Sequence, residues 1–399
     1  MRKLGAIVLV ALAAAAAALA GTRATPGVTN DTILLGGTAP LSGEAAAAGN
    51  ISRGAKAYFD YVNAHGGVNG RKIEYKIIDD GYEPARTVQA ARQLVQQDEV
   101  FALFGTVGTN NNLAIRSFLN QAQVPQLFVN AGATTFGTDY KQYPYTIGFI
   151  PSYAAEGRIY GQRISKTKPK AKIAVLYQND EYGSDLVGGL QKGLGSKAKQ
   201  IVAKVGYDPT ASDVQSQVAQ LKASGADVFC IFAFGKFAIQ SFIYVNKLGW
   251  HPQIYVNDVA SASSLMVLSP AAATEGAISI VFGKDPAVPQ WRNDKGLKLF
   301  RSIMKQYLPD VSPNDGFAAA GAGSAFTMVD TLKKAGKNLT RQSVVNAATH
   351  LNEPNNPFLL PGITIKTTPT SRFPISQVKL QRWHKGSWVI FGPLLNARP

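Results

Sequence analysis

Two short loops rich in glycine and threonine have the composition of an anion-binding site. The first is Gly105-Thr106-Val107-Gly108-Thr109 and the second is Ala131-Gly132-Ala133-Thr134-Thr135. Small residues let backbone N–H groups approach an anion closely, and threonine hydroxyls add donors without adding positive charge. The chemistry indicated is capture of a small-molecule carboxylate by hydrogen bonds.

The elements that would position these loops are buried parallel strands. Apolar runs at 100–104 and 126–129 directly precede the two loops, and a helical pattern over 111–121 follows the first loop. In an open α/β sheet, ligands bind at the carboxyl ends of the strands. The two loops are therefore expected at one edge of one sheet.

Strand-like and helix-like patterns alternate along the chain in two successive blocks. The first block runs from 33 to about 150, and the second begins with a strand pattern at 173–177. Helical patterns at 296–307 and 316–335 follow, and the tail is expected to be β, with a hairpin around Lys385-Gly386. This alternation predicts an α/β protein with two units that contain parallel sheets.

The N-terminus has the features of a secretory signal. Met1-Arg2-Lys3 precedes an apolar run over 5–19, and Ala18-Leu19-Ala20 supplies the small residues of a cleavage site. We expect residues 1–20 to be a signal peptide and the mature protein to be soluble and exported. A membrane anchor is the alternative, but this alanine-dominated run barely reaches the length needed to span a bilayer.

The charge composition bears on whether the partner is a nucleic acid. The 399 residues carry a formal net charge of +16, which raises the possibility of nucleic-acid binding. The basic residues are scattered, however, and no nucleic-acid-binding motif occurs, so we interpret the charge as solvated surface and predict no nucleic-acid partner. Cys230 is the only cysteine and lies in an apolar run, where we expect a buried packing role.

The chain has no sequence motif typical of an enzyme. It contains no nucleophile elbow, zinc-binding His-Glu-x-x-His pair, phosphate loop or complete dinucleotide fingerprint. Asp79-Asp80 closes a strand and precedes Gly81, so we interpret this pair as forming turn and cap hydrogen bonds. We expect no enzymatic activity, no metal and no cofactor.

A series of short motifs carries a resemblance that covers nearly the whole mature chain. The motifs are Ala39-Pro40-Leu41-Ser42-Gly43, residues 54–63, Gly66-Gly67-Val68-Asn69-Gly70-Arg71, Asp79-Asp80 with Pro84, Val124-Pro125, Gly132-Ala133-Thr134 and Asp180-Glu181-Tyr182-Gly183. In this order they resemble the periplasmic solute-binding proteins of ABC importers, in the branched-chain amino acid and amide group. The resemblance implies a type I periplasmic binding protein.

The fold that this resemblance implies is two Rossmann-like lobes joined by three crossovers, with the ligand enclosed between them. Transferred to this chain, lobe 1 comprises 28–150 and 284–361, and lobe 2 comprises 151–283 and 362–397. The implied crossovers lie near Pro151, Gly283 and Gly362.

The resemblance also implies a set of ligand-binding residues. Thr109 and the loop Gly132, Ala133 and Thr134 match the family positions that bind the carboxylate and ammonium of an amino acid. Tyr182 matches a tyrosine that closes over the ligand from the other lobe. Asp258 aligns with an acidic residue that pairs with the ammonium, although a helix N-cap is an equally good interpretation of this residue.

Two departures from the family pattern bear on the ligand. Phe234 stands where a tyrosine is common, and Ala48 stands where an aromatic residue is common. The expected ligand is an amino acid or a related small carboxylate or amide, with an aromatic carboxylate as the alternative to a branched-chain amino acid. We expect a monomer that presents its ligand to an ABC permease in the membrane; a periplasmic sensor that docks a receptor is the alternative.

Overall fold

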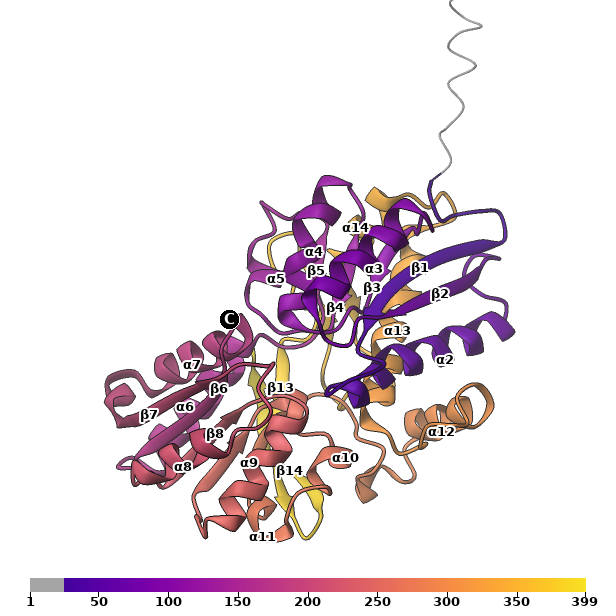
Figure 1. Cartoon of the computed structure of the whole chain (residues 1–399). Coiled ribbons are helices and arrows are strands. Elements are labelled where there is room, and N and C mark those ends of the chain that lie inside the picture. The colour runs from indigo at the N-terminus through magenta and orange to yellow at the C-terminus, as the bar shows by residue number, and fades with distance from the viewer. Residues whose placement is uncertain (1–24) are drawn as a thin grey trace, which may run out of the picture.

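Two β-sheets form the centres of two lobes in the computed structural model (Figure 1). The structure describes residues 25–399, so the predicted signal peptide lies outside the described residues. The predicted α/β class and two-lobe architecture are confirmed.

The first sheet has five strands in the order β2-β1-β3-β4-β5, and every neighbouring pair is parallel. Its strands are β1 (Thr32–Ala39), β2 (Lys72–Asp79), β3 (Ala102–Phe104), β4 (Gln126–Val129) and β5 (Thr146–Gly148). All five carboxyl ends therefore lie at one edge of the sheet.

The second sheet has seven strands in the order β14-β13-β10-β9-β8-β6-β7. Five strands are parallel: β6 (Ile173–Gln178), β7 (Ile201–Tyr207), β8 (Val228–Phe232), β9 (Gln253–Val256) and β10 (Ile278–Val281). The C-terminal hairpin of β13 (Gln377–His384) and β14 (Ser387–Asn396) adds two antiparallel strands. The predicted hairpin around Lys385-Gly386 is confirmed.

Helices cover both faces of each sheet (Figure 1). Around the first sheet lie α2 (Asn50–Ala64), α3 (Pro84–Gln96), α4 (Thr109–Gln121), α5 (Thr135–Thr138), α12 (Lys295–Tyr307), α13 (Gly316–Ala335) and α14 (Arg341–Ala348). Around the second lie α6 (Tyr153–Thr167), α7 (Glu181–Leu194), α8 (Gln215–Ala223), α9 (Lys236–Lys247), α10 (Ser263–Met266) and α11 (Ala271–Thr274).

The core strand β8 illustrates why the strand patterns are continuously apolar. Val228, Cys230 and Phe232 pack into one hydrophobic cluster, whereas Phe229 and Ile231 pack into another on the opposite face. Successive strand residues point to opposite faces, so a strand covered on both sides needs apolar residues throughout. The buried packing role expected of Cys230 is confirmed.

Close helix packing places α13 against α2, where both helices supply walls of the functional cavity described below. A Cβ atom on Gly321 would lie 1.8 Å from the carbonyl oxygen of Ile51, so only glycine fits at this contact. Gly157 in α6 faces Leu186 of α7 in the same way. Sequence patterns did not predict α6. Its interior glycines weaken the helical pattern in the sequence, although close packing against α7 requires them.

The chain passes between the sheets after β5, after β10 and before β13. The short strands β11 (Asn352–Glu353) and β12 (Ile365–Lys366) pair with each other. Arg372 then donates to the carbonyl oxygens of Pro144 and Thr146 beside the first sheet. We therefore place the third passage nearer Ser376 than Gly362; the other lobe boundaries remain a prediction.

Candidate functional site

A cavity lies between the two lobes, where the carboxyl ends of their parallel strands face each other. Its walls bound about 1200 Å³ of empty space, part of which is open solvent. Tyr82 follows β2, Thr109 follows β3, Tyr182 follows β6, Phe234 follows β8 and Asp258 follows β9, and all of them line this cavity. This is the position where α/β sheets bind ligands.

Aromatic side chains form much of the cavity wall. The first lobe contributes Tyr82, Phe317 and Phe358, and the second contributes Tyr153, Tyr182 and Phe234. Phe149 and Phe282, from segments that connect the lobes, complete this group. The walls therefore suit a ligand with an apolar or aromatic body.

The structure brings together some of the predicted site residues and leaves others apart. Thr109, Tyr182, Phe234 and Asp258 share the cavity although they lie far apart in sequence. The loop Gly132-Ala133-Thr134 is not among the lining residues. Contact of any of these residues with a ligand remains a prediction.

The first loop holds Thr109 at the cavity wall. Gly108 has φ = 96°, a left-handed conformation that favours glycine, and Thr109 is the first residue of α4. The Asn112 side-chain amide donates to the carbonyl oxygen of Gly108 at 2.6 Å and stabilises this turn. The first N–H groups of a helix lack intrahelical partners, so Thr109 offers donors at the site.

Several polar groups of the second loop already have partners within the protein. The N–H of Thr134 donates a 2.6 Å hydrogen bond to the carboxylate of Asp185 on α7. The Thr134 hydroxyl lies 3.0 Å from the hydroxyl of Ser152, and the carbonyl oxygen of Gly132 accepts from the N–H of Tyr153 at 2.8 Å. The loop thus binds a carboxylate, but one that belongs to the opposite lobe.

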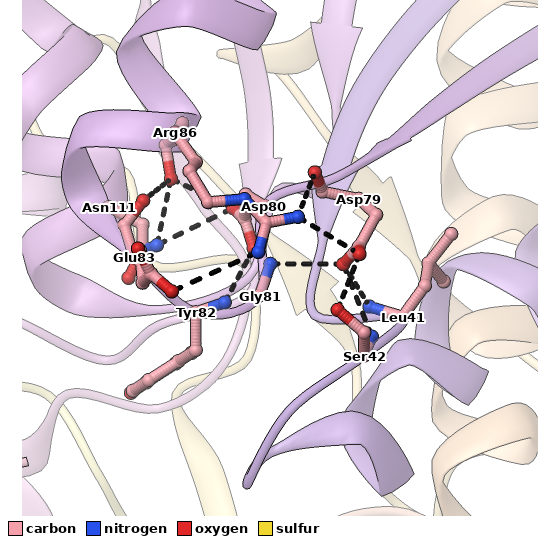
Figure 2. Close-up of polar contacts among 10 residues, drawn as sticks. Leu41, Ser42, Asp79, Asp80, Gly81, Tyr82, Glu83, Arg86 and Asn111 are labelled. Atoms are coloured by element: carbon pink, nitrogen blue, oxygen red, sulfur yellow. Dashed lines mark hydrogen bonds and ion pairs between the residues drawn. The ribbon is translucent and has the colours of Figure 1, made fainter. Parts of the chain in front are cut away.

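The acidic pair Asp79-Asp80 holds the turn that follows β2 (Figure 2). The Asp79 carboxylate accepts 2.9 Å hydrogen bonds from the N–H groups of Leu41 and Gly81, and Asp80 accepts from the N–H of Tyr82 at 3.0 Å. Burial would raise the pKa of Asp79, but its hydrogen bonds outweigh burial and lower the pKa to about 2. The interpretation of this pair as turn-forming is confirmed.

This turn directs Tyr82 to the cavity. Gly81 and Tyr82 both have positive φ, at 56° and 66°, and the Tyr82 side chain extends away from the polar network (Figure 2). Its ring lies 5.3 Å from the ring of Phe234 on the other lobe, measured between centroids. Sequence reasoning missed Tyr82; its place immediately after Asp-Asp-Gly at a strand end was the available signal.

Tyr182, which the resemblance places over the ligand, is a buried residue of the cavity wall. It is 3% exposed, and its ring makes a T-shaped contact with Tyr153 at 4.9 Å between centroids. Within the described residues, its buried hydroxyl has no hydrogen-bond partner. A buried hydroxyl without a partner costs free energy. A ligand group that forms a hydrogen bond with the Tyr182 hydroxyl would remove this cost and bind more tightly.

A pair of carboxyl groups lies beneath the same wall. The N–H of Asp258 donates to the Glu156 carboxylate at 2.7 Å, and the Tyr160 hydroxyl lies 2.6 Å from the same oxygen. Burial raises the pKa of Asp258 and of Glu156, and repulsion by Asp258 raises that of Glu156 further. Asp258 is therefore a half-buried acidic wall residue that keeps its proton to a higher pH than a free carboxyl group does.

The cavity wall offers no uncommitted cation. Of the described lining residues, Lys284 alone carries a cationic side chain, and its ammonium is bound to Asp294 at 2.8 Å and to the carbonyl oxygen of Pro357 at 2.9 Å. The carboxylate of Asp285 also lines the cavity and accepts from the N–H groups of Ser263 and Ala287. The balance of charge at the wall is negative.

The lobes contact each other beside the cavity. Lys236 on α9 forms a 2.9 Å ion pair with Glu44 of the first lobe, in addition to the Tyr82–Phe234 and Thr134–Asp185 contacts. These contacts come from loops and helices that lie far apart in sequence. The two lobes therefore touch each other at the edge of the cavity.

Two further searches covered all the described residues. No helix within 25–399 is long and apolar enough to cross a membrane. In the same range, no three His, Cys, Asp or Glu side chains form a group that could hold a metal ion.

Known proteins share sequence and fold with this chain. A family model described as "Periplasmic binding protein" matches residues 32–387. A "Leu/Ile/Val-binding protein homolog 7" of Brucella suis is 28% identical over 232 residues, which cover 56% of this chain and 58% of the relative. The chain thus spans little more than half the length of that curated relative in the match.

Two solved structures have the same fold over nearly their whole length. A branched-chain amino acid ABC transporter from Thermus thermophilus with bound valine has a TM-score of 0.78 and 16% identity, covering 93% of this chain and 97% of that one. A solute-binding protein from R. palustris in complex with 4-hydroxybenzoate has a TM-score of 0.76 and 19% identity, covering 92% and 98%.

Proposed function

The chain belongs to the periplasmic binding protein family, whose members bind solutes without catalysing a reaction, and we propose that it is the solute-capturing subunit of an ABC importer. The family implies a location outside the cytoplasm. On this proposal, the chain acts as a monomer that encloses one small solute and presents its closed form to a membrane permease.

The observation that carries the proposal is the composition of the cavity wall. Residues of both lobes and of the connecting segments line one cavity, so a bound solute would contact all of them. A ligand that contacts both lobes has higher affinity for the closed arrangement and shifts the population towards it. Closure then supplies the signal that a permease, or in the alternative role a sensor receptor, can recognise.

The charge of the wall favours an amino acid or a related amide as the solute. Asp258 is positioned to accept hydrogen bonds from an ammonium or amide group, whereas Lys284 is committed to Asp294. An aromatic carboxylate, the alternative, would fit the aromatic walls but would meet Asp258 and Asp285 with no neutralising cation.

Calorimetry and solute uptake test this proposal. Amino acids, amides and aromatic acids are screened by thermal shift on the mature chain, because a ligand that binds only the native state raises the melting temperature. We expect binding of one solute per chain without chemical change, and loss of uptake of that solute by cells lacking the chain. Turnover of the solute would contradict the proposal, and uptake that persists without the chain would favour the sensor role.

A further inference from the structure

One end of the second lobe carries a group of lysines without acidic neighbours in sequence. The segments 158–178 and 186–207 contain no aspartate or glutamate. Their exposed or half-buried lysines, which we call the basic surface, are Lys166, Lys168, Lys170, Lys172, Lys192, Lys197, Lys199 and Lys204. Within residues 25–399, none of these lysines forms an ion pair with a carboxylate.

Tertiary packing brings these lysines together from separate segments. α6 and α7 pack side by side, and the short helix η2 (Gly195–Gln200) follows α7 (Figure 1). The ammonium of Lys197 donates to the carbonyl oxygen of Ser165 at 2.9 Å, and the side-chain amide of Gln200 donates to that of Pro169 at 2.8 Å. These bonds hold η2 against the connection between α6 and β6, so charge that is spread along the sequence is concentrated in one region.

The basic surface and the cavity lie at opposite ends of β6. Lys172 directly precedes this strand, whereas Tyr182 follows its carboxyl end. None of the lysines of the basic surface is among the described residues that line the cavity. A partner bound at the basic surface therefore does not need to contact the solute.

Stabilisation of helix ends explains only part of this charge. Lys166 and Lys192 lie in the last turns of α6 and α7, where a cation interacts favourably with the helix dipole. The lysines of the connection 168–172 and Lys204 of β7 lie outside these turns. The neighbouring carboxylate of Asp227 accepts a backbone N–H of this connection at 2.7 Å. Like charges gathered in one region repel one another, and an anionic partner relieves this repulsion.

Val202 bears on which kind of anionic partner fits. Its side chain is 44% exposed and shares a face of β7 with Lys204, because successive strand residues point to opposite faces. An exposed apolar side chain beside lysines suits a membrane interface, which offers both headgroups and acyl chains, better than a nucleic-acid backbone. The location outside the cytoplasm that the family implies also favours a membrane over a nucleic acid.

We propose that the basic surface binds a membrane whose phospholipid headgroups carry negative charge. Each lysine near such a membrane is attracted to it, and this attraction falls off within a Debye length. The contact is peripheral and reversible by salt, and it raises the concentration of the chain near a membrane permease. The inference goes beyond the proposed function, because it concerns a second surface that requires neither solute nor permease for binding.

Co-sedimentation of the mature chain with phospholipid vesicles tests this inference. The vesicles contain either phosphatidylcholine alone or equal parts of phosphatidylcholine and phosphatidylglycerol. We expect binding to the anionic vesicles only. Raising the NaCl concentration from about 0.01 M to about 1 M shortens the Debye length about tenfold and should release the bound protein.

Two variants with the same change in net charge assign the binding to the basic surface. The first replaces four of its lysines by glutamine: Lys168→Gln, Lys170→Gln, Lys172→Gln and Lys199→Gln. The control removes four exposed lysines of the first lobe: Lys295→Gln, Lys298→Gln, Lys305→Gln and Lys337→Gln. The first variant should bind anionic vesicles about tenfold more weakly or worse, while the control should bind nearly as the unaltered chain does. If the first variant does not fold, the double variant Lys170→Gln with Lys199→Gln should show a smaller loss in the same direction.

Three results would overturn the inference. They are equal binding to neutral and anionic vesicles, equal weakening by the two matched variants, and tighter binding to a short DNA duplex than to anionic vesicles at the same salt concentration. Absence of vesicle binding would also overturn it but would leave the proposed function intact, since solute binding and uptake are measured separately. Conversely, a chain that binds anionic vesicles but no solute would contradict only the proposed function.

Discussion

The N–H of Asp258 and the carboxylate of Glu156 are joined by a 2.7 Å hydrogen bond, which places two acidic residues from different elements together below the cavity wall. Glu156 is 1% exposed and belongs to α6, whereas Asp258 follows β9. Because partial or full burial disfavours the ionised form of each group, and ionised Asp258 repels ionised Glu156, the pKa values of both carboxyl groups are raised.

This pair should make the ligand-free protein less stable as pH rises. Carboxyl groups in the unfolded chain ionise at about pH 4, whereas Asp258 and Glu156 in the folded protein keep their protons to higher pH. The unfolded state then binds fewer protons, so the free energy of unfolding falls from about pH 4 into the neutral range. Asp258→Asn should reduce this fall and stabilise the protein at pH 8 by about 1 kcal/mol or more.

Urea unfolding of the ligand-free chain at pH 5 and pH 8 measures this effect. Asp208→Asn serves as the matched control because its carboxylate lies in an exposed loop. Parallel pH profiles for the unaltered chain and Asp258→Asn would contradict the assignment of the effect to the acidic pair.

Tyr182→Phe should separate the roles of the ring and the hydroxyl. The hydroxyl is buried without a partner, so its removal should leave the melting temperature unchanged or raise it, while affinity for a solute that hydrogen-bonds to it should fall severalfold. Tyr182→Ala would instead leave a void and cost about 3–5 kcal/mol of stability. Thermal shift measures the stability of Tyr182→Phe, and calorimetry measures its affinity for the solute. Unaltered affinity would show that the Tyr182 hydroxyl does not contact the solute and that the residue only packs.

Thr109 and Thr134 should respond differently to substitution by alanine. Thr109 lines the cavity, so loss of its hydroxyl should weaken solute binding by about 1–3 kcal/mol. The Thr134 hydroxyl faces Ser152, and Thr134→Ala keeps the N–H that binds Asp185, so its effect should be on stability. Calorimetry on both variants tests this contrast, and equal loss of affinity would show that both loops contact the solute.

Asp79→Ala should destabilise the turn that positions Tyr82. The carboxylate accepts several hydrogen bonds but is about one-third exposed (30%), so we expect a loss near the lower end of about 1–3 kcal/mol. The lowered pKa of Asp79 means that this contribution is present above about pH 4 and lost as pH falls towards 2. Denaturation of both proteins at pH 3 and pH 6 should show a smaller difference at pH 3.

Export should remove residues 1–20. The apolar run is short and ends at small residues, so the mature protein should begin at Gly21. N-terminal sequencing of the exported protein checks the site. A chain that begins at Met1 and fractionates with membranes would contradict the prediction.

The sequence by itself determined many of the elements and their order. Helical spacing predicted α2 and α13 to within one residue at each end, and the continuously apolar run of β8 predicted a strand buried on both faces. These patterns are local, since periodicity of 3.6 or 2 residues depends only on neighbours along the chain. The turn-forming role of Asp79-Asp80 was also evident, because Gly81 and Tyr82, which donate to the two carboxylates, follow directly in the sequence.

The tertiary structure alone decided which side chains share the cavity and which are used internally. Tyr82 and Phe234 meet although they belong to different lobes, and the N–H of Thr134 is bound to Asp185 from α7. A loop sequence specifies that donors exist, but not what accepts from them. That depends on how two separately folded sheets approach each other, a long-range geometry that local sequence patterns do not encode.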